Sequence, residues 1–544
     1  MTLMNVLARA EAVAAGRAVP AATVRHRWLA QSPIVLVPLT TAGEAGAPLG
    51  AMVGTERDAP TLLVVPQPLD RELRFGFFAG LAAAVLPVIE SYADDVETEP
   101  GRKGGEETEV CADAPQIIVP NSAALEYVRL LGRSTRYLRT VEDPDAPHPV
   151  PVPVPLLGRW LTHCAERART PGSALLVAMT DLLTRHWATG QSAMEDQHLG
   201  GLLGWIDPPP GLDGPAAAAR AQTGRDRDGL LLSPPAGPAT DPVFDNRVLA
   251  PALERYDAAK AAGATGPLRV AEADVQRLVA SQLRPTWDDV WHGVDLLRAL
   301  PEGAHVAERW KRDRWSFTGH RDRVRAGEPP QPKRDDAVTA AQKLAGRETA
   351  QARLSAQEAL DDPLVMAARR LAGEAFTGRV LAVEMTYSEG RRPMPRPLLT
   401  VGTPDVPQAD PGAKAYRAVP DAKSAQTAEV LGVVAPEPPA ADAQAPAGAR
   451  LPGPRAPVGE PPSWTVTVKL TGGMGTGKVP REGSVPEVGD RVTFTLFAHD
   501  QRGGPALPEP EATPWTHGGP PGAAGAAVAA APEVPDTVTA EDFL

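Results

Sequence analysis

Short, fully apolar runs alternate with helical stretches in the first part of the chain. Three runs are β-rich and compact, and they cover residues 33–37, 62–65 and 116–119. Helical stretches follow from about Asp70 to Tyr92 and from Ser122 to Leu131, and Asn121 is placed to cap the second of these. Strands that are apolar throughout are typical of parallel strands covered on both faces. We expect residues 1–140 to form an α/β domain with parallel pairing.

The middle of the chain, residues 158–375, has the 3.6-residue period of helices. Ala174 to His186 reads as one helix, and Thr286 is placed to cap another. A proline-rich hinge at 141–157 separates this helical domain from the first, and a stretch at 206–240 is rich in loop-forming residues.

The period then changes to two, which predicts strands. Four are expected, at 378–387, 397–401, 464–470 and 491–497. They indicate a small β-barrel over 376–499. Proline and alanine dominate 404–462 and the tail 500–544, so we expect a long disordered insertion and a disordered tail. The predicted fold class is α+β and multidomain, with an N-terminal α/β layer, a helical middle and this barrel.

One loop of the predicted barrel carries the pattern GxxxxGK, from Gly472 to Lys478. A phosphate-binding P-loop needs a buried strand before it, and a Ser or Thr that opens a helix after it. Val479 and Pro480 follow instead, and the strands on both sides alternate apolar and polar positions. We interpret the segment as a hairpin or barrel loop.

The predicted barrel has one weak likeness to known proteins. Its glycine-opened first strand at Thr377-Gly378-Arg379-Val380 and its closing strand at Val488-Gly489-Asp490-Arg491-Val492 look like those of small OB-like or SH3-like barrels. Such barrels occur beside nucleic-acid enzymes and as insertions in some superfamily-1 helicases. The likeness implies proximity to nucleic acid, although no helicase motif accompanies it.

Composition sets broad limits on the function. The 544 residues include 60 prolines and 50 glycines, and arginine outnumbers lysine 46 to 9, as in a GC-rich bacterial genome. The net charge of −12 argues against a general coating of DNA. Two cysteines and no export signal favour a soluble, cytoplasmic protein. The apolar run Phe75–Ile89 is too short to cross a bilayer, so we expect no membrane partner.

Candidate metal and catalytic patterns are weak. Cys164-Ala165-Glu166 is similar to the CAE motif of cytidine deaminases, but no later cysteine completes that family's zinc site. His163, His186 and His198 match no ligand spacing. We expect no metal, assign no cofactor and assign no catalytic residue.

One basic stretch stands above the background. Seven cations, two acids and three aromatic residues lie between residues 309 and 325. Arginine pairs with phosphate and aromatic rings stack on unpaired bases, so the pattern favours nucleic acid, single-stranded in particular. The alternative is a helix whose aromatic residues are core anchors and whose cations meet the protein's own acids. The candidate binding residues are Arg309, Lys311, Arg312, Arg314, Trp315, Phe317, Arg321, Arg323 and Arg325. An acidic insert at 94–113, with eight carboxylates, is expected to be a solvated loop.

The sequence favours a cytoplasmic accessory protein that binds nucleic acid and serves a helicase or nuclease encoded elsewhere. One alternative is an enzyme with a pocket at the carboxyl ends of the N-terminal strands, where α/β folds place ligands. Gln67, Asp70, Arg71 and Asn121 are then the lining residues. A second alternative is a non-catalytic scaffold that meets protein partners through its acidic C-terminal tail. Whether the protein is an enzyme stays open, with the balance toward none.

Overall fold

The computed structural model describes residues 3–100, 107–335, 337–389, 393–419, 424–436, 463–475 and 477–500. Helices and strands are mixed in the chain, which divides into two compact units, Leu3–Ala350 and Gln351–Gly503. Each unit has its own cluster of buried apolar side chains. The two units thus have separate hydrophobic cores.

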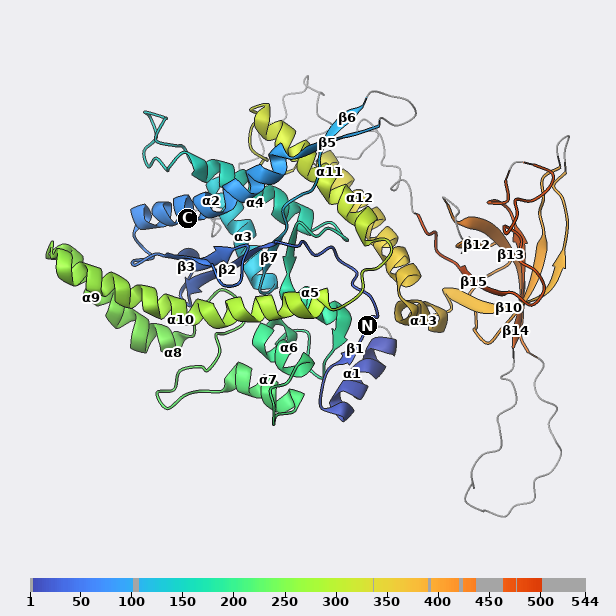
Figure 1. Ribbon diagram of the computed structural model, residues 1–544, viewed down its shortest axis with the longest axis horizontal. Helices are drawn as coiled ribbons and strands as arrows, with labels where there is room; N and C mark the ends of the chain where they lie inside the picture. The colour runs from blue at the N-terminus through green and yellow to red at the C-terminus, as the bar shows by residue number, and fades with distance from the viewer. Residues whose placement is uncertain are drawn as a thin grey trace, which may run out of the picture. The chain divides into compact units, whose positions relative to one another are not determined.

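A five-stranded mixed sheet forms the centre of the first unit (Figure 1). Its strands are β2 (Ile34–Thr41), β3 (Glu44–Gly54), β4 (Thr61–Val64), β7 (Ile117–Val119) and β8 (Leu176–Ala178). Their spatial order is β4-β3-β2-β7-β8. Strands β4, β3 and β2 form an antiparallel meander, whereas β2, β7 and β8 run parallel to one another. The predicted parallel pairing is therefore present in one half of the sheet only.

The parallel strands are apolar because both of their faces are covered. In β2, every residue from Ile34 to Thr40 is buried, and β7 and β8 are buried along their whole length. The helices α2 (Arg71–Asp94), α3 (Ser122–Thr135) and α4 (Pro153–Ala168) pack on one side of the sheet, and α10 (Thr265–Arg298) packs on the other (Figure 1). The first unit is thus a three-layer sandwich of helices, sheet and helices.

Helix α2 is apolar on nearly all sides. It is the one helix among the described residues that is long and apolar enough to cross a membrane by length and composition. Phe75, Phe78, Leu81 and Ile89 from α2 are buried in the core of the first unit. Asp70 begins the helix by accepting hydrogen bonds from the backbone N–H groups of residues 72 and 73.

Helix α10 differs from its prediction at its start. The sequence suggested a cap at Thr286, but the helix begins 21 residues earlier, at Thr265, and Pro285 lies inside it. Buried side chains recur on one face on both sides of the proline, from Ala271 to Leu297. Burial of this continuous stripe outweighs the hydrogen bond that Pro285 cannot make.

The expected boundary between an α/β domain and a helical domain is not where the structure divides. Residues 174–186, predicted as one helix, contain the strand β8 and then α5 (Met179–His186). Strand β8 pairs with β7, so the chain beyond the proline hinge completes the sheet of the first unit. Hinge residues also enter α4, which begins at Pro153. A three-residue strand is too short to show a period of two.

Shorter elements complete the first unit. They are α1 (Leu3–Ala15), β1 (Val19–Pro20), β9 (Trp187–Ala188), η2 (Glu195–Gln197), α6 (Leu199–Ile206), α7 (Gly214–Thr223), α8 (Pro242–Phe244), η3 (Asp245–Leu249), α9 (Ala250–Ala261) and α11 (Val306–Arg325). The stretch 206–240, expected to be loop-rich, thus contains one helix, α7. Helix α12 (Ala337–Asp361) contains the point at which the chain divides.

The acidic insert is not a plain solvated loop in its described part. It contains the antiparallel hairpin of β5 (Val96–Glu99) and β6 (Thr108–Cys111). Helix α11 packs against β6, and the hairpin and helix lie side by side in Figure 1. This contact brings the insert's carboxylates to the basic stretch.

The second unit is built on a closed, six-stranded antiparallel barrel. Its strands are β10 (Ala375–Glu384), β11 (Leu398–Thr403), β12 (Lys414–Arg417), β13 (Gln426–Val434), β14 (Trp464–Leu470) and β15 (Arg491–Thr495), in the order β10-β11-β14-β13-β12-β15. Strand β11 lies beside β14 after β12, β13 and β14 have paired in succession, which is a Greek key. Helix α13 (Pro363–Leu371) precedes the barrel, and Asp362 caps it by accepting a hydrogen bond from the backbone N–H of Leu364.

Two strands of the barrel were missed in the sequence. Strands β12 and β13 lie inside 404–462, which was predicted to be a disordered insertion, and this part of the prediction is wrong. Their composition is rich in alanine, but Ala415, Ala428 and Val430 face the barrel core in alternation and are buried. Residues 437–462 and 501–544 lie outside the described residues.

The GxxxxGK segment is a barrel loop. Strands β14 and β15, which flank it, do not pair with each other. No helix occurs between residues 471 and 490 in the part that the structure describes, and Lys478 is exposed. Met474 points its side chain into the barrel core and is 2% exposed. Gly473 has a φ of 80°, and a Cβ there would meet Gln426 Cα at 2.9 Å, so glycine serves the loop's geometry rather than phosphate binding.

Candidate functional site

The basic stretch forms helix α11, and its inner face is part of the core. Phe317 is fully buried beside Trp160, with ring centroids 5.0 Å apart. Trp310 is 5% exposed, and its indole N–H donates to Asp113 at 2.6 Å. The aromatic residues at these two positions are therefore core anchors.

Arginines on the inner face and flanks of α11 are also used within the protein. The Arg309 guanidinium donates to the His26 carbonyl at 3.0 Å, and Arg321 donates to the Ala93 carbonyl at 3.2 Å. Both side chains are buried, which leaves them no access to a phosphate backbone. They hold α11 to segments that lie more than 200 residues earlier in the chain.

Carboxylates of the acidic insert meet most of the remaining cations. Arg314 lies 2.7 Å from Glu97 and also pairs with Glu99, and Lys311 lies 2.9 Å from Glu99. On the last turn of α11, Arg325 pairs with Asp94. The protein's own acids thus take up much of the charge that suggested nucleic acid.

The outer face of α11 is different, because Trp315 lies on it. Its side chain is 42% exposed, which makes it the most exposed tryptophan among the described residues. Arg312, three residues earlier, pairs with Glu308 at the surface. Arg323, two turns later, is exposed and has no carboxylate within 4.0 Å in the described part of the chain. Of the nine predicted residues, the structure leaves Lys311, Arg312, Trp315 and Arg323 at the surface of this face.

Gly319 lies one turn after Trp315 on the same face. A Cβ added at Gly319 would meet no atom within 4 Å, so the space beside the indole is open. Residues four apart on a helix are neighbours, and a larger side chain there would cover the ring. The indole is consequently accessible from the side of Arg323.

The alternative pocket at the strand ends is not assembled. Gln67 donates to Asp257 at 2.7 Å, and Asp70 caps α2 and pairs with Lys260 at 2.7 Å, which lowers the pKa of its carboxyl. Asn121 is buried, and it caps α3 by accepting from Ala124 N at 3.0 Å. Arg71 is exposed at the start of α2.

The sheet order explains why these four side chains do not converge. The strands β4 and β7 that precede them are separated by β3 and β2, which is three strand spacings or about 14 Å. Sequence alone suggested that the two strands were neighbours. The polar groups that do meet at the ends of β7 and β8 are Ser122, Asp181 and Gln197, and they hydrogen-bond to one another.

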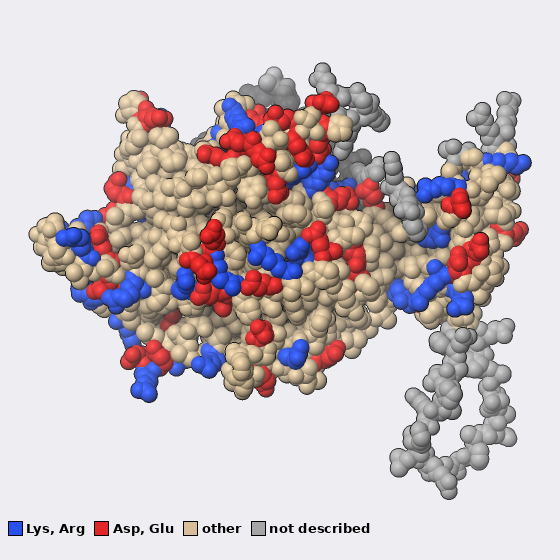
Figure 2. Space-filling view, in the orientation of Figure 1, with Lys and Arg blue, Asp and Glu red and all other residues tan. Residues whose placement is uncertain are grey.

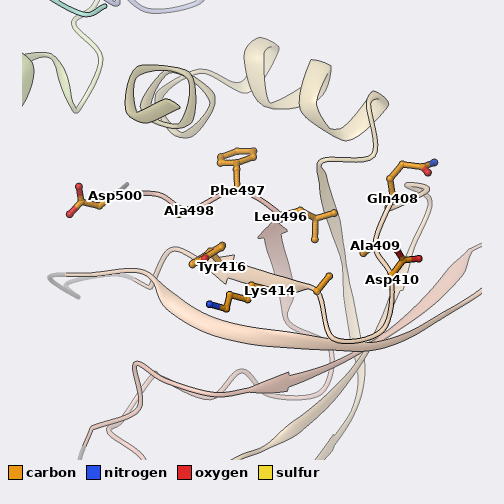
Figure 3. A pocket seen from close by; sticks show the side chains of 10 residues that line it. Gln408, Ala409, Asp410, Lys414, Tyr416, Leu496, Phe497, Ala498 and Asp500 are labelled. Atoms are coloured by element: carbon orange, nitrogen blue, oxygen red, sulfur yellow. The ribbon is translucent and has the colours of Figure 1, made fainter. Parts of the chain in front are cut away.

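A wide pocket opens on the barrel of the second unit (Figure 3). Its volume is about 920 Å³. Strands β12 and β15 share a single pair there, Tyr416 with Thr495, and the chain beyond β15 diverges from β12. Tyr416 and Phe497 supply rings to the pocket, while Lys414, Asp410 and Asp500 supply charges. The pocket combines flat apolar surface with unlike charges.

No family model, no curated protein and no solved structure matches this chain.

Proposed function

We propose that this chain is an accessory protein that binds single-stranded nucleic acid through the outer face of α11. The observation that supports the proposal is the exposed indole of Trp315 with open space at Gly319 beside it. Exposed tryptophan is unusual on a protein surface, and an uncovered ring can stack on an unpaired base of any type. Arg323, which has no carboxylate within 4.0 Å in the described part of the chain, lies on the same face and supplies the cation for a flanking phosphate.

The charge pattern makes the expected binding weak and local. Figure 2 shows acidic and basic side chains interspersed on the face in view, without a broad basic field. A single stacking residue with two or three cations fits a short unpaired segment presented by a partner such as a helicase or nuclease. It does not fit coating of a long duplex.

The test is a fluorescence-anisotropy titration of a labelled oligothymidylate at about 50 mM salt, where phosphate contacts are strongest. Trp315→Ala is expected to lower the affinity by about 1–3 kcal/mol, or roughly 5- to 150-fold, with little effect on duplex. Its melting temperature is expected to stay unchanged, because Trp315 is outside the core. A wild type without affinity, or a Trp315→Ala variant that binds as well as wild type, contradicts the proposal and leaves the scaffold interpretation.

Two arginines give a matched comparison in the same assay. Arg323→Ala is expected to weaken binding at low salt and to reduce the salt slope by about one phosphate contact. Arg325→Ala removes a cation that is already paired with Asp94, so it is expected to change affinity less. If the two variants lower the affinity equally, the nucleic acid does not bind preferentially to the outer face of α11, and the proposal is contradicted.

A further inference from the structure

A second cavity lies in the first unit, away from the outer face of α11. Its volume is about 440 Å³, which is in the range of small-molecule sites. Apolar side chains from α6, α7 and the chain around them form about half of the wall. The polar lining consists of Asp207, Arg220, Ser233, Asp289 and His292.

The side chain of Asp289, on α10, lines this cavity and has no hydrogen-bond partner in the described part of the chain. No described residue donates a hydrogen bond to its carboxylate, and its Oδ2 lies against Gly200, where a Cβ would approach to 3.2 Å. Burial, with a smaller contribution from the neighbouring charge of Asp288, raises the pKa of Asp289 to about 7. A carboxylate that is partly removed from water and has no donor within the protein costs free energy, so its position calls for an explanation.

The groups around Asp289 are arranged differently from a metal site or an anion site. Asp207 and His292 are occupied with each other, with Nε2 and Oδ2 3.0 Å apart. Among the described residues, no group of three or more His, Cys, Asp or Glu side chains is placed to hold a metal ion. Arg220 is the one arginine in the lining, and it stands at the exposed edge. The lining thus mixes apolar and polar side chains, and the Asp289 carboxyl is its one unpaired acid in the described part of the chain.

We propose that this cavity binds a small organic cation with an apolar body, whose ammonium group pairs with the carboxylate of Asp289. Leu203, Leu212 and Leu232 line the space for the apolar body. The ammonium supplies the donors that the protein does not. An unpaired, partly buried charge that waits for a ligand is a local conflict of the kind found at binding sites.

Two glycines of α6 make room for the cavity and for the Asp289 carboxyl. Gly200 and Gly204 are one turn apart on α6. Gly204 allows α6 to approach α7 closely, since a Cβ there would lie 3.1 Å from Ala217. Gly200 leaves room for the Asp289 carboxyl itself. The close approach of α6 and α7 at Gly204 forms one wall of the cavity, while the missing side chain at Gly200 leaves space at Asp289.

The first experiment is isothermal titration calorimetry of the full chain with phenethylamine as the cationic probe and 2-phenylethanol as its neutral counterpart. Phenethylamine is expected to bind at least about tenfold more tightly, the worth of one charged hydrogen bond. Asp289→Asn is expected to remove that preference, and Asp288→Asn, on the exposed side of the same turn, is expected to keep it. Lack of phenethylamine binding at about 10 mM, where so small a ligand should bind, or an unchanged preference in Asp289→Asn, overturns the proposal.

A melting curve without ligand separates this role from a structural one. Asp289→Asn removes an unpaired carboxylate, so the melting temperature is expected to stay the same or to rise. If Asp289 instead stabilises the first turn of α6 as a charge at a helix N-terminus, the same variant melts at a lower temperature, and the proposal is wrong. Neither result bears on binding by Trp315.

The pH dependence gives an independent readout. Asp289, with its pKa of about 7, must ionise to pair with the cation, so affinity for phenethylamine is expected to rise about tenfold from pH 6 to pH 8. Asp288, Asp207, His292 and Arg220 are the other charged or titratable groups that face it. The rise should be absent in Asp289→Asn, and a rise that persists there assigns the titration to another of these groups and contradicts the proposal.

Discussion

At the scale of single residues, two histidines pack face to face in the core of the first unit. The rings of His163 and His320 have centroids 4.2 Å apart and planes 7° apart, and both side chains are buried. Burial lowers the pKa of His320 to about 3, and this value includes smaller contributions from the nearby charges of Arg323 and Arg159. Burial and the same surroundings lower the pKa of His163 as well. Both rings are therefore neutral at pH 7.

We expect this pair to make the first unit sensitive to acid. The unfolded chain takes up protons below about pH 6.5, while the folded pair resists them. The free energy of unfolding is therefore at its full value above pH 6.5 and falls as the pH drops toward 3. The loss is about 1.4 kcal/mol for each unit by which the folded and unfolded pKa values differ. Chemical denaturation between pH 7 and pH 4 measures the slope.

A matched pair of variants isolates the contribution of the stacked histidines. His320→Gln is expected to flatten the slope of stability against pH, and His148→Gln, at an exposed position, is expected to leave it as in wild type. Some slope should remain in both variants, because burial also lowers the pKa of His186 to about 4. Identical slopes in the two variants would count against the stacked pair as the source.

Residue-scale predictions from sequence succeeded where the cause is local. Asn121 was predicted to cap a helix, and it does, because a cap depends on the next few residues only. The absence of a helix after Lys478 was equally local. The unpaired carboxylate of Asp289 was not foreseeable, because the residues around it come from α6 and α7, which lie far from it in sequence.

At the scale of elements, α11 and the β5–β6 hairpin stabilise each other. The side chain of Arg314 is 15% exposed, and it contacts the Ala112 carbonyl at 2.9 Å as well as two glutamates of β5. Removal of this side chain takes a partner from both glutamates and leaves the partly buried Glu99 with Lys311 alone. Arg325, in contrast, pairs with Asp94 where both side chains are at least half exposed.

These two arginines are expected to differ in their effect on stability. Arg314→Ala should lower the free energy of unfolding by about 1.5–3 kcal/mol, the worth of hydrogen bonds to charged groups. Arg325→Ala should lower it by less than about 1 kcal/mol, as exposed ion pairs do. Urea denaturation at low and high salt measures both, and a larger loss from Arg325→Ala would refute this account of the contact.

The same contact shows what a local pattern leaves out. The spacing of Trp310 and Phe317 in the basic stretch is that of a buried helix face, and that alternative was visible in the sequence. The partners of the arginines were not, because the acidic insert lies about 200 residues earlier in the chain. Charge within one segment cannot reveal which distant segment neutralises it, and this is why several of the predicted cations proved to be paired within the protein.

At the scale of the whole molecule, two compact units stand where three domains were predicted. The short strand β8 joins the middle of the chain to the first sheet, and its three residues carried too little pattern to show this. The barrel was predicted from four strands with a clear period of two. Its other two strands were hidden by alanine-rich composition, which scores poorly for strand but fits the narrow interior of a barrel.

Separate cores predict separate responses to a core mutation. Phe376 and Phe494 stack inside the barrel with ring centroids 5.5 Å apart, and both are fully buried. Phe494→Ala is expected to cost about 3–5 kcal/mol in the barrel. Amide hydrogen exchange should then accelerate in β10 to β15 and stay unchanged in β2, β7 and β8. Equal acceleration in the sheet of the first unit would contradict the division into two cores.

The pairing of β13 with β14 has a practical consequence for engineering. Val434 and Thr465 are cross-strand partners, so the two ends of the chain between them are held side by side by the barrel itself. The entropy of closing such a loop grows only with the logarithm of its length, by about 0.6 kcal/mol for each doubling. A fluorescent protein or an affinity tag whose own ends are adjacent can therefore be spliced into this position, which gives a reporter site that leaves the barrel's hydrogen bonding intact.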